Sequence, residues 1–482
     1  MTITAVDFPL ERTPLDPKQL GSPDWWVKQL HGRVVAKRPT LNLLHRYSVG
    51  DAPLMDLPAD AREAFIDFQR RARTNFAGLS VEVMLDRMKV AGVRTGAAGD
   101  ALGDSEAWDM WQANQLDADA PALHRASLVM GEAFVIVGDI DDEIEAPLIT
   151  IEDPRNIAIA RDGQRRRRID KALKVFVDEW TGNEHAYLYE RGFDGYPATV
   201  RRAEITKGSR SAGWRWIGEA DSLPFSQPPI VWFPNRLDID GRTCWGEFQQ
   251  DRDVLDRINT TILQRLVITA MQAFRQKMLT GLPLKDENGA EINYDGMFPA
   301  DPAALWQLPA GVALLEGAAY DPTPLLMATK DDVTHYAAQT RTPLPSLQPD
   351  AANQSGANTE MVWAGHIAKC LDRMSTLSEG WEEVVQLGFL WKGETERARR
   401  RDMEVLWMPP DIPSLAERYD AVGKAQAAGI PEDFIRLHIV GMSPQEIRRY
   451  QAEMATAEVA AAAAAAAAAE DQTHQTPDFQ PI

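Results

Sequence analysis

The sequence contains little cysteine and no long uncharged apolar run. Cys244 and Cys370 are the only cysteines among 482 residues, which excludes a disulfide framework and fits a reducing compartment. No apolar run reaches the ~18–20 residues that a membrane helix needs. The first residues also lack the basic-then-apolar pattern of a signal peptide. These absences predict a protein that is neither secreted nor anchored in a membrane.

Positive charge is also scarce, with 51 Lys and Arg against 71 Asp and Glu and a net charge of −20. Proteins that hold nucleic acid tightly usually present a basic face, because neutralising phosphates supplies most non-specific affinity. The balance argues against tight DNA binding, but it is compatible with a wall past which DNA slides. Acidity that only keeps the protein in solution is the alternative.

The motifs of common catalytic classes are missing. The sequence has no G-x-x-x-x-G-K-[ST], G-x-G-x-x-G, G-x-S-x-G or H-E-x-x-H, and its eight histidines are scattered. An acidic run covers residues 139–143. A calcium loop that began at Asp139 would place Ile144 at its glycine position and Thr150 at its final acid. We therefore expect an acidic hairpin tip there, and no catalytic site, metal or cofactor.

The strongest local pattern runs from Ile230 to Lys277. A short apolar strand, Ile230–Phe233, precedes a polar turn at Asn235–Gly241, and a helix is predicted over Gly246–Lys277. At ~1.5 Å per residue this helix would span roughly 48 Å. Acids near its start and bases near its end suit the helix macrodipole. They are Glu247, Asp251, Asp253 and Asp256 at the start, and Arg265, Arg275 and Lys277 at the end.

Two apolar stripes at helical spacing run along this segment. The first consists of Leu255, Ile258, Ile262 and Leu266, and the second of Leu263, Val267, Ala270 and Phe274. A helix with so wide an apolar face needs neighbours on more than one side. A long core helix of a large globular protein and a helix between subunits both meet that need.

Five short stretches precede this segment in order: Leu44–Leu54, Asn75–Val93, Trp108–Asp117, Gly131–Gly138 and Ile151–Pro154. With the strand, the Phe-Pro-Asn-Arg turn and the Asp-Arg-Ile-Asn of residues 256–259, they resemble the portal proteins of tailed bacteriophages. More narrowly, they resemble the portal proteins of siphophages that infect actinobacteria. Any one match is weak, but together they cover most of residues 40–410.

The resemblance implies an α+β portal fold with a mixed α/β wing, a long-helix stem, a small clip and a helical crown. The implied boundaries are wing 1–238, first stem helix 239–279, clip 280–324, second stem helix 325–341, tunnel loop 342–358, second part of the wing 359–412, crown 413–470 and a disordered tail 471–482.

The resemblance also implies function and partners. It predicts a homo-oligomeric, dodecameric ring at one capsid vertex, the head-to-tail connector of the virion, assembled in the host cytoplasm. Double-stranded DNA would pass through it during packaging and ejection. Implied partners are the terminase large subunit, the major capsid and scaffolding proteins and the head–tail adaptor proteins. An enzyme of unrecognised type with an acidic pocket, or a capsid or tail protein that forms no ring, remains the alternative.

Three groups of residues are assigned roles by this resemblance. Leu255, Ile258, Ile262 and Leu266 would form the stem interface. Lys285, Asp286, Glu287 and Tyr294 would dock partners on the clip. Gln348, Asn353, Gln354, Ser355 and Asn358 would line the tunnel loop, where three prolines in residues 341–358 break the helical pattern. An ordinary surface loop is the alternative for that segment.

Further elements are predicted from local patterns. Helices are expected at 57–75, 105–114, 120–130, 325–340, 359–391, 414–428 and 431–439, and in a last helix from Ser443 through the alanine run 460–469. Strands are expected at 134–137, 148–151, 173–180, 186–190, 199–202, 214–217 and 403–408. Ser443, Pro444 and Glu446 are typical of a capping box. The arginine run 165–168 is predicted at a solvated hairpin tip, with a contact to DNA or an acidic neighbour as the alternative.

Overall fold

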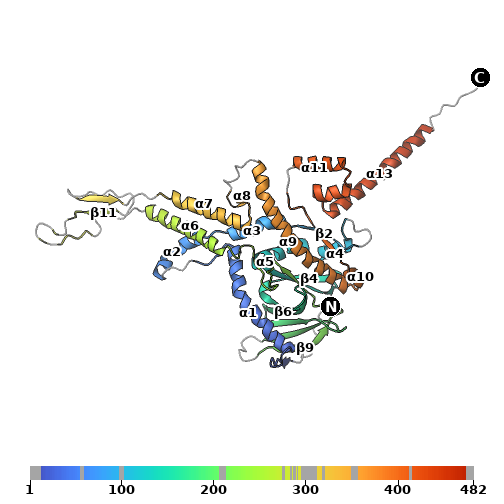
Figure 1. Ribbon diagram of the computed structural model, residues 1–482, viewed down its shortest axis with the longest axis horizontal. Coiled ribbons are helices and arrows are strands. Elements are labelled where there is room, and N and C mark those ends of the chain that lie inside the picture. The colour runs from blue at the N-terminus through green and yellow to red at the C-terminus, as the bar shows by residue number, and fades with distance from the viewer. Residues whose placement is uncertain are drawn as a thin grey trace, which may run out of the picture.

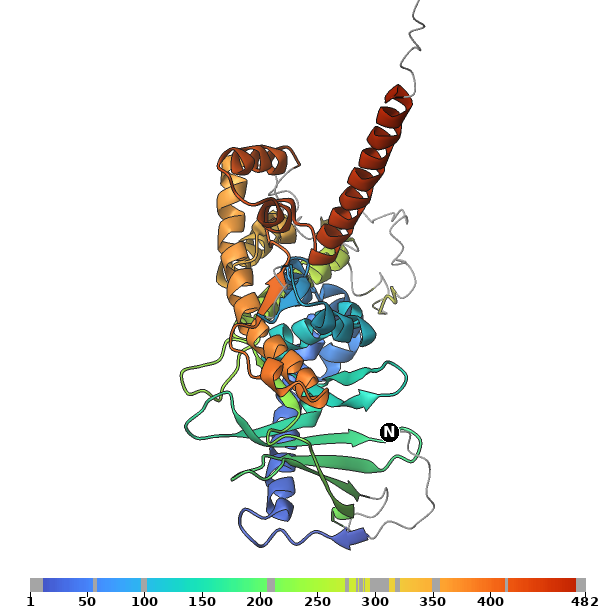
Figure 2. The same cartoon turned by 90° about the vertical axis from the view of Figure 1, so that its right-hand side faces the viewer.

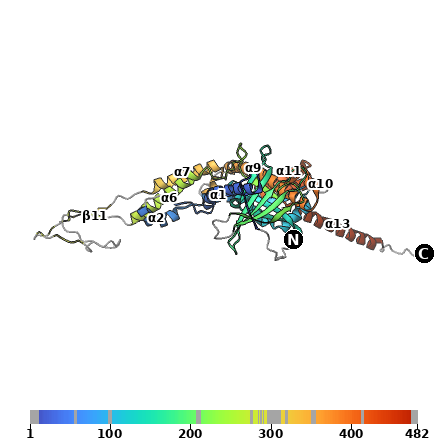
Figure 3. The same cartoon turned by 90° about the horizontal axis from the view of Figure 1, so that it is seen from below.

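The computed structural model describes residues 12–54, 59–96, 102–205, 213–273, 277–282, 285, 289, 291–294, 312–316, 321–348, 356–411 and 415–473. Two arms leave a central body in opposite directions (Figures 1 and 3). One arm contains α6 (Arg252–Ala273) and α7 (Thr323–Thr340), with the hairpin of β11 (Lys277–Thr280) and β12 (Ala313–Glu316) beyond them. The other is α13 (Pro444–Thr473). The mixture of helices and sheets confirms the predicted α+β class.

Two antiparallel sheets form one end of the body (Figure 2). The larger has the order β1-β9-β8-β7-β6-β5, and the smaller has the order β10-β3-β4. Their bounds are β1 Arg12–Pro14, β3 Glu132–Asp141, β4 Ala146–Glu152, β5 Ile157–Arg161, β6 Ile169–Val177, β7 Glu184–Glu190, β8 Thr199–Ile205, β9 Arg215–Ser222 and β10 Ile230–Pro234.

The larger sheet is covered on both faces. Helix α1 (Pro23–Ser48) packs Leu30 and neighbouring apolar residues against Leu173 on one face. The smaller sheet packs Phe134 and Trp232 against Ala172 on the other. Ala172 and Leu173 are consecutive in β6, so their side chains point to opposite faces, as the period of two in a strand requires.

Helix α1 was not predicted, although its start carries a clear signal. The hydroxyl of Ser22 accepts a hydrogen bond from the Trp25 amide at 3.1 Å, and Pro23 occupies the first turn. Pro39 lies inside the helix at an exposed position. There the carbonyl that loses its intrahelical partner can reach water, which makes the proline tolerable.

Most of the other predicted helices and strands are confirmed with shifted ends. The confirmed helices are α2 Ala59–Ala72, α4 Ser105–Ala113, α5 Leu116–Met130, α7, α9 Gly356–Trp391, α11 Leu415–Ala427 and α13. α3 (Phe76–Leu85) and β2 (Val90–Arg94), which pairs with β13 (Glu404–Trp407), complete the body. The predicted helix at 431–439 is instead a short turn, α12 (Glu432–Phe434), followed by the π-helix η3 (Ile435–Val440).

Helix α9 runs along one side of the body (Figure 2), and its Met374, Leu377 and Trp381 belong to the main core. Trp381 is fully buried with its ring centroid 5.1 Å from that of Phe233. Gly380 allows this close approach, because a Cβ atom there would lie 2.4 Å from the Phe233 ring. The Trp381 indole donates to His124 at 2.9 Å, and burial lowers the pKa of His124 to about 3, so that this imidazole is neutral.

The C-terminal helix begins as the sequence predicts. The Glu446 amide donates to the Ser443 hydroxyl at 3.2 Å, and the Ser443 amide donates to the Glu446 carboxylate at 2.7 Å, which is a reciprocal capping box. Residues 452–466 are all exposed. The alanine-rich part of α13 therefore stands away from the body (Figure 1), held by its own helix propensity.

Candidate functional site at the base of the helix pair

Helices α6 and α7 lie side by side and form one arm of the molecule (Figures 1 and 3). The chain runs outward along α6 and returns along α7. Near the body the two helices share an ion pair, in which Arg257 Nε lies 2.9 Å from Asp332 Oδ1. Val333 and Tyr336 of α7 are buried in the same core as Leu255 and Ile258 of α6. The pair therefore grows out of the main core rather than from a separate one.

The structure corrects the extent of the first long helix. The prediction was Gly246–Lys277, but α6 covers Arg252–Ala273. Glu247 and Asp251 precede the helix, and Lys277 begins strand β11. The acids at 247 and 251 thus do not serve the helix dipole as first-turn residues, and Glu247 has a different role described below.

The predicted stem-interface stripe divides into two parts. Leu255 and Ile258 are 2 % and 0 % exposed within the single chain. Ile262 and Leu266, one and two turns further out, are only partly buried. The inner part of the stripe is therefore core. Ile262 packs against the edge of that core, and both Ile262 and Leu266 keep part of their apolar surface exposed in the single chain. Placement of Ile262 and Leu266 at a subunit interface remains a prediction.

All four residues of the Asp-Arg-Ile-Asn motif have a structural role at the base of α6. Asp256 accepts a hydrogen bond from the Tyr47 hydroxyl at 2.7 Å, and Arg257 pairs with Asp332. Ile258 is buried, and Asn259 Oδ1 accepts from the amide and hydroxyl of Thr74. Two stretches that carry the family resemblance, residues 44–54 and 256–259, therefore touch each other.

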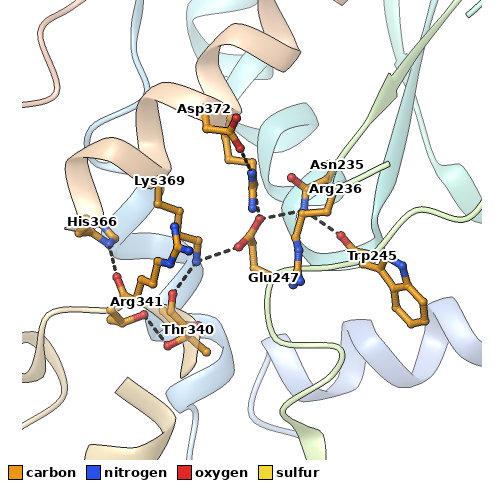
Figure 4. Close-up of polar contacts among 12 residues, drawn as sticks. Asn235, Arg236, Trp245, Glu247, Thr340, Arg341, His366, Lys369 and Asp372 are labelled. Carbon is orange, nitrogen blue, oxygen red and sulfur yellow. Dashed lines mark hydrogen bonds and ion pairs between the residues drawn. The ribbon is translucent and has the colours of Figure 1, made fainter. Parts of the chain in front are cut away.

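A buried ion-pair network fixes the base of the arm (Figure 4). Glu247 Oε2 lies 2.7 Å from Lys369 Nζ, and Glu247 Oε1 lies 2.6 Å from Arg373 Nε. Asn235 donates to Glu247 Oε1 at 2.9 Å. Only 3 % of the Glu247 side chain is exposed. We call Glu247, Lys369 and Arg373 the anchor, because they join the segment before α6 to helix α9.

The charges of the anchor stabilise one another. Burial opposes ionisation of Glu247, but Lys369 and Arg373 outweigh burial and lower the pKa of Glu247 to about 2. Burial lowers the pKa of Lys369, and the carboxylate of Glu247 opposes that shift. Removing the Glu247 carboxylate would leave Lys369 buried with only the Thr340 carbonyl as a partner and Arg373 with only the exposed Asp372, so the carboxylate is the centre of the network.

The anchor extends to the C-terminal end of α7. Lys369 Nζ also donates to the Thr340 carbonyl at 2.7 Å, and His366 Nδ1 lies 3.0 Å from the Arg341 carbonyl oxygen. Arg341 ends α7 in the left-handed region, with φ 51°. Helix α9 thus holds the base of α7 and the segment leading into α6 at the same time.

Sequence patterns alone missed the anchor. Glu247 was interpreted as a helix-dipole residue, and Lys369 and Arg373 were not selected. The sequence did carry a signal. Lys369 and Arg373 lie four residues apart in the predicted helix 359–391, and the residues that directly follow them, Cys370 and Met374, are apolar. Two bases on a buried face of a helix usually require an acidic partner.

The predicted tunnel-loop residues are only partly described. Gln348 donates its side-chain amide to the Lys330 carbonyl at 3.0 Å, which folds the segment back on α7. Asn353, Gln354 and Ser355 lie outside the described residues. Asn358 belongs to α9 rather than to a loop. With α8 at Leu344–Leu347, the predicted irregular segment of 341–358 is shorter than expected.

The predicted clip residues are likewise described in part. Lys285 is exposed and forms an isolated β-bridge with Glu291, and Tyr294 is half-buried. Asp286 and Glu287 lie outside the described residues. Their proposed docking role is not tested by this geometry and stays a prediction.

Two charged turns have the predicted form. The acidic run at 139–143 ends β3, and Asp141 accepts a hydrogen bond from the Glu143 amide at 2.9 Å. The arginine run at 165–168 lies in the turn between β5 and β6, with 165–167 exposed. In the part of the chain that the structure describes, no three His, Cys, Asp or Glu side chains gather as a metal site requires. Within the same ranges, no helix combines the length and the apolarity that crossing a membrane demands.

Comparison with known proteins gives one family. The family model for phage portal proteins of the SPP1 Gp6-like type matches residues 36–459. The portal protein of Mycobacterium phage L5 is 24 % identical over 411 residues, 80 % of each chain. That of Mycobacterium phage D29 is 25 % identical over 408 residues, again 80 % of each. Among solved structures, a chain in the neck of an empty gene transfer agent particle has a TM-score of 0.43 at 13 % identity, covering 80 % of this chain and 95 % of that one.

Proposed function

This chain belongs to the SPP1 Gp6-like family of phage portal proteins, and we propose that its α6–α7 arm builds the channel wall of a twelve-membered ring. The family forms an oligomeric ring in the neck of the virion, and its members are structural proteins rather than enzymes. In the proposed ring, double-stranded DNA passes along the arm during packaging and ejection.

One observation carries this proposal: the outer half of the arm has apolar surface that one chain does not cover. Ile262 and Leu266 of α6 are only partly buried. On α7, Leu326 is 38 % exposed and Met327 67 % exposed. Adjacent apolar side chains left in water usually mark an interface. A head-to-tail contact between identical arms, repeated around an axis, would cover this surface and close a ring.

The charge balance supports a channel in which DNA moves. Twelve chains of net charge −20 would carry roughly −240 in total, and like charge keeps phosphates from forming lasting contacts. Within this proposal, residues 342–358 approach the DNA, with Gln348, Asn353, Gln354, Ser355 and Asn358 as the polar, neutral contacts. Neutral amides and hydroxyls form single hydrogen bonds with phosphates without the counterion release that strengthens Lys and Arg contacts.

The remaining regions are assigned by the same proposal. The two sheets and α1 belong to the wing, and α11 to α13 belong to the crown. The segment 280–324, with Lys285, Asp286, Glu287 and Tyr294, docks the terminase large subunit during packaging and the head–tail adaptors afterwards. The major capsid and scaffolding proteins surround the ring at its vertex.

Ring formation is tested by Ile262→Asp. A carboxylate buried at an apolar contact without a partner costs several kcal/mol or takes up a proton, so we expect the variant to fold but not to assemble. The matched control is Gln264→Asp, which adds the same charge to an exposed position of α6. Negative-stain imaging and native mass spectrometry of both variants give the subunit count. Intact rings for Ile262→Asp would exclude this residue from the interface.

The same measurement separates the alternatives. A wild-type protein that stays monomeric at all concentrations would favour a capsid or tail component that forms no ring. Rings with a different number of subunits would still support the proposed channel, but the proposed subunit count of twelve would be wrong.

A further inference from the structure

A cavity of about 660 Å³ lies away from the helix pair, between α1 and the two sheets. Its walls include Arg33 and Lys37 of α1, Arg161 at the end of β5, and Arg166 in the turn that follows. Trp232 of β10 and Arg242, in the loop between β10 and α6, complete it. The volume is within the range of small-molecule sites, roughly 300–1,000 Å³.

The cavity is cationic although the chain as a whole is acidic. Five bases line it against three acids, Glu132, Asp162 and Asp240. Each acid is already engaged: Glu132 pairs with Lys37 at 2.6 Å, Asp162 faces Arg168 at 3.4 Å, and Asp240 accepts the amides of Arg242 and Thr243. The four arginines have no carboxylate within 4.0 Å among the described residues. They are Arg33, Arg161, Arg166 and Arg242.

Arg161 has unused hydrogen-bonding capacity in this cavity. Its guanidinium lies over the Trp232 ring, 4.3 Å from the centroid, and its Nη1 is buried without a hydrogen-bond partner among the described residues. Burial lowers the pKa of Arg161, and the charge of Arg242 adds to that effect. A buried N–H without a partner in a native protein usually awaits a ligand or an ordered water.

The loop that carries Arg242 is held in place before any ligand arrives. Arg166 Nη2 donates to the Ile239 carbonyl at 2.6 Å. Gly241 has a φ of +64°, and a Cβ atom there would lie 3.2 Å from Arg166 Cδ. Asp240 also accepts the Thr243 hydroxyl at 2.7 Å. The Arg166 guanidinium and the backbone at Arg242 are therefore held in place, which reduces the entropy lost on binding.

We propose that this cavity binds a phosphate group, with Arg161 and Arg242 as its principal ligands. Planar guanidinium groups match the oxygens of a phosphate with paired, charge-assisted hydrogen bonds. Trp26, which also lines the cavity and is only partly buried, offers an apolar wall for an organic body attached to the phosphate. The phosphate is either that of a free phosphate ester or that of a nucleic-acid backbone, and the site is independent of the channel.

The test is isothermal titration of the assembled protein with pyrophosphate, AMP, adenosine and a single-stranded DNA of about 20 nucleotides. We expect saturable binding of pyrophosphate or AMP and none of adenosine. Arg242 is exposed, so Arg242→Ser should fold normally, and it should weaken binding about tenfold or more, as expected for a charge-assisted hydrogen bond. Arg399→Ser removes the same charge from an exposed position that directly follows the short helix α10 (Thr395–Ala398), and it should change affinity less than twofold. Arg161→Gln should abolish binding.

The outcomes divide cleanly. Binding of the DNA alone, with the same dependence on Arg242, would assign the phosphate to nucleic acid and still support the site. The proposal is overturned if no probe saturates, if Arg242→Ser and Arg399→Ser weaken binding equally, or if adenosine binds as well as AMP. Negative-stain imaging of the same samples tests ring formation separately. A failure of the phosphate-binding test would therefore not affect the proposed channel.

Discussion

The inner and outer halves of α6 differ in how completely a single chain buries their apolar side chains and pairs their polar ones. In the inner half, Leu255 and Ile258 are buried, and Asp256 and Asn259 have partners from α1 and the segment before α3. In the outer half, Ile262 and Leu266 retain exposed apolar surface. The same helix therefore belongs to the monomer core at one end and keeps partly exposed apolar surface at the other, where we propose that a neighbouring subunit packs.

This difference teaches how folding and assembly can be separated along a single element. A change in the inner half should act on the stability of the isolated chain. A change in the outer half should act on association and leave the chain folded.

Glu247→Gln should be the most damaging, because it leaves Lys369 buried without a carboxylate and Arg373 paired only with the exposed Asp372. Breaking a buried pair in this way costs about 3–5 kcal/mol. Urea denaturation of the monomer measures the change, and Glu453→Gln, which removes an exposed partner of Arg449, should cost less than about 1 kcal/mol. Equal effects of the two variants would show that the anchor does not hold the base of the arm.

Ile258→Ala should destabilise the monomer by about 2–4 kcal/mol, since it opens a cavity in a fully packed core. Ile262→Ala, one turn outward, should change monomer unfolding by less than half as much and weaken ring formation instead. Denaturation curves and the concentration dependence of assembly should separate the two. A larger monomer effect at Ile262 would reverse the proposed division.

An acid of α9, Glu383, should respond to pH in the opposite direction from Glu247 of the anchor. Burial raises the pKa of Glu383 to about 7, against the charges of Arg191 and Arg167. Its contribution to stability is therefore fully present below the ordinary value of 4.5 and is lost as pH rises through about 7. Glu247, with its pKa lowered to about 2, contributes above 4.5 and loses that contribution as pH falls through about 2.

Glu383→Gln should therefore gain about 1–2 kcal/mol over the wild type at pH 8 and nothing at pH 4. Thermal unfolding between pH 4 and pH 8 measures the gain. Glu396→Gln, at an exposed position, is the control that should leave the pH profile unchanged. If the thermal stability of Glu383→Gln changes with pH in parallel with that of the wild type, Glu383 does not have the raised pKa proposed for it.

Tyr47→Phe should have the smallest effect, because it removes only the hydrogen bond to Asp256. A single hydrogen bond to a charged group contributes about 1–3 kcal/mol. We expect about 1 kcal/mol, since Asp256 at the edge of the core can turn to water. Tyr419→Phe, at a tyrosine that is 70 % exposed, should be neutral. If Tyr47→Phe and Tyr419→Phe have the same effect on stability, the contact between α1 and Asp256 does not stabilise the base of the arm.

Local sequence patterns predicted the elements that one stretch of chain determines by itself. The apolar period of α6, the capping box at Ser443 and the alternating strands all depend on neighbours within a few residues. Their existence was predicted well and their ends less well. The start of α6 was misplaced because the acids at 247 and 251 fit a helix start equally well on local grounds.

Contacts between distant segments were beyond such patterns. The partners of Glu247 lie in α9, more than a hundred residues later, and Tyr47 meets Asp256 across 209 positions. Helix α1 was missed because its two prolines resemble loop signals unless the burial of Val27, Leu30 and Val34 is known. The cationic cavity was invisible because its bases come from α1, β5 and two separate loops.

The position of the anchor has a mechanical consequence. Helix α6 has 22 residues, so at ~1.5 Å per residue it is a lever about 33 Å long with its pivot at the base. A tilt of about one degree at the pivot moves the far end by roughly 0.6 Å. If α6 lines the channel of a ring as proposed, the same radial tilt in every subunit would change the bore by about twice that amount, and the buried anchor at the pivot would set the diameter of the opening.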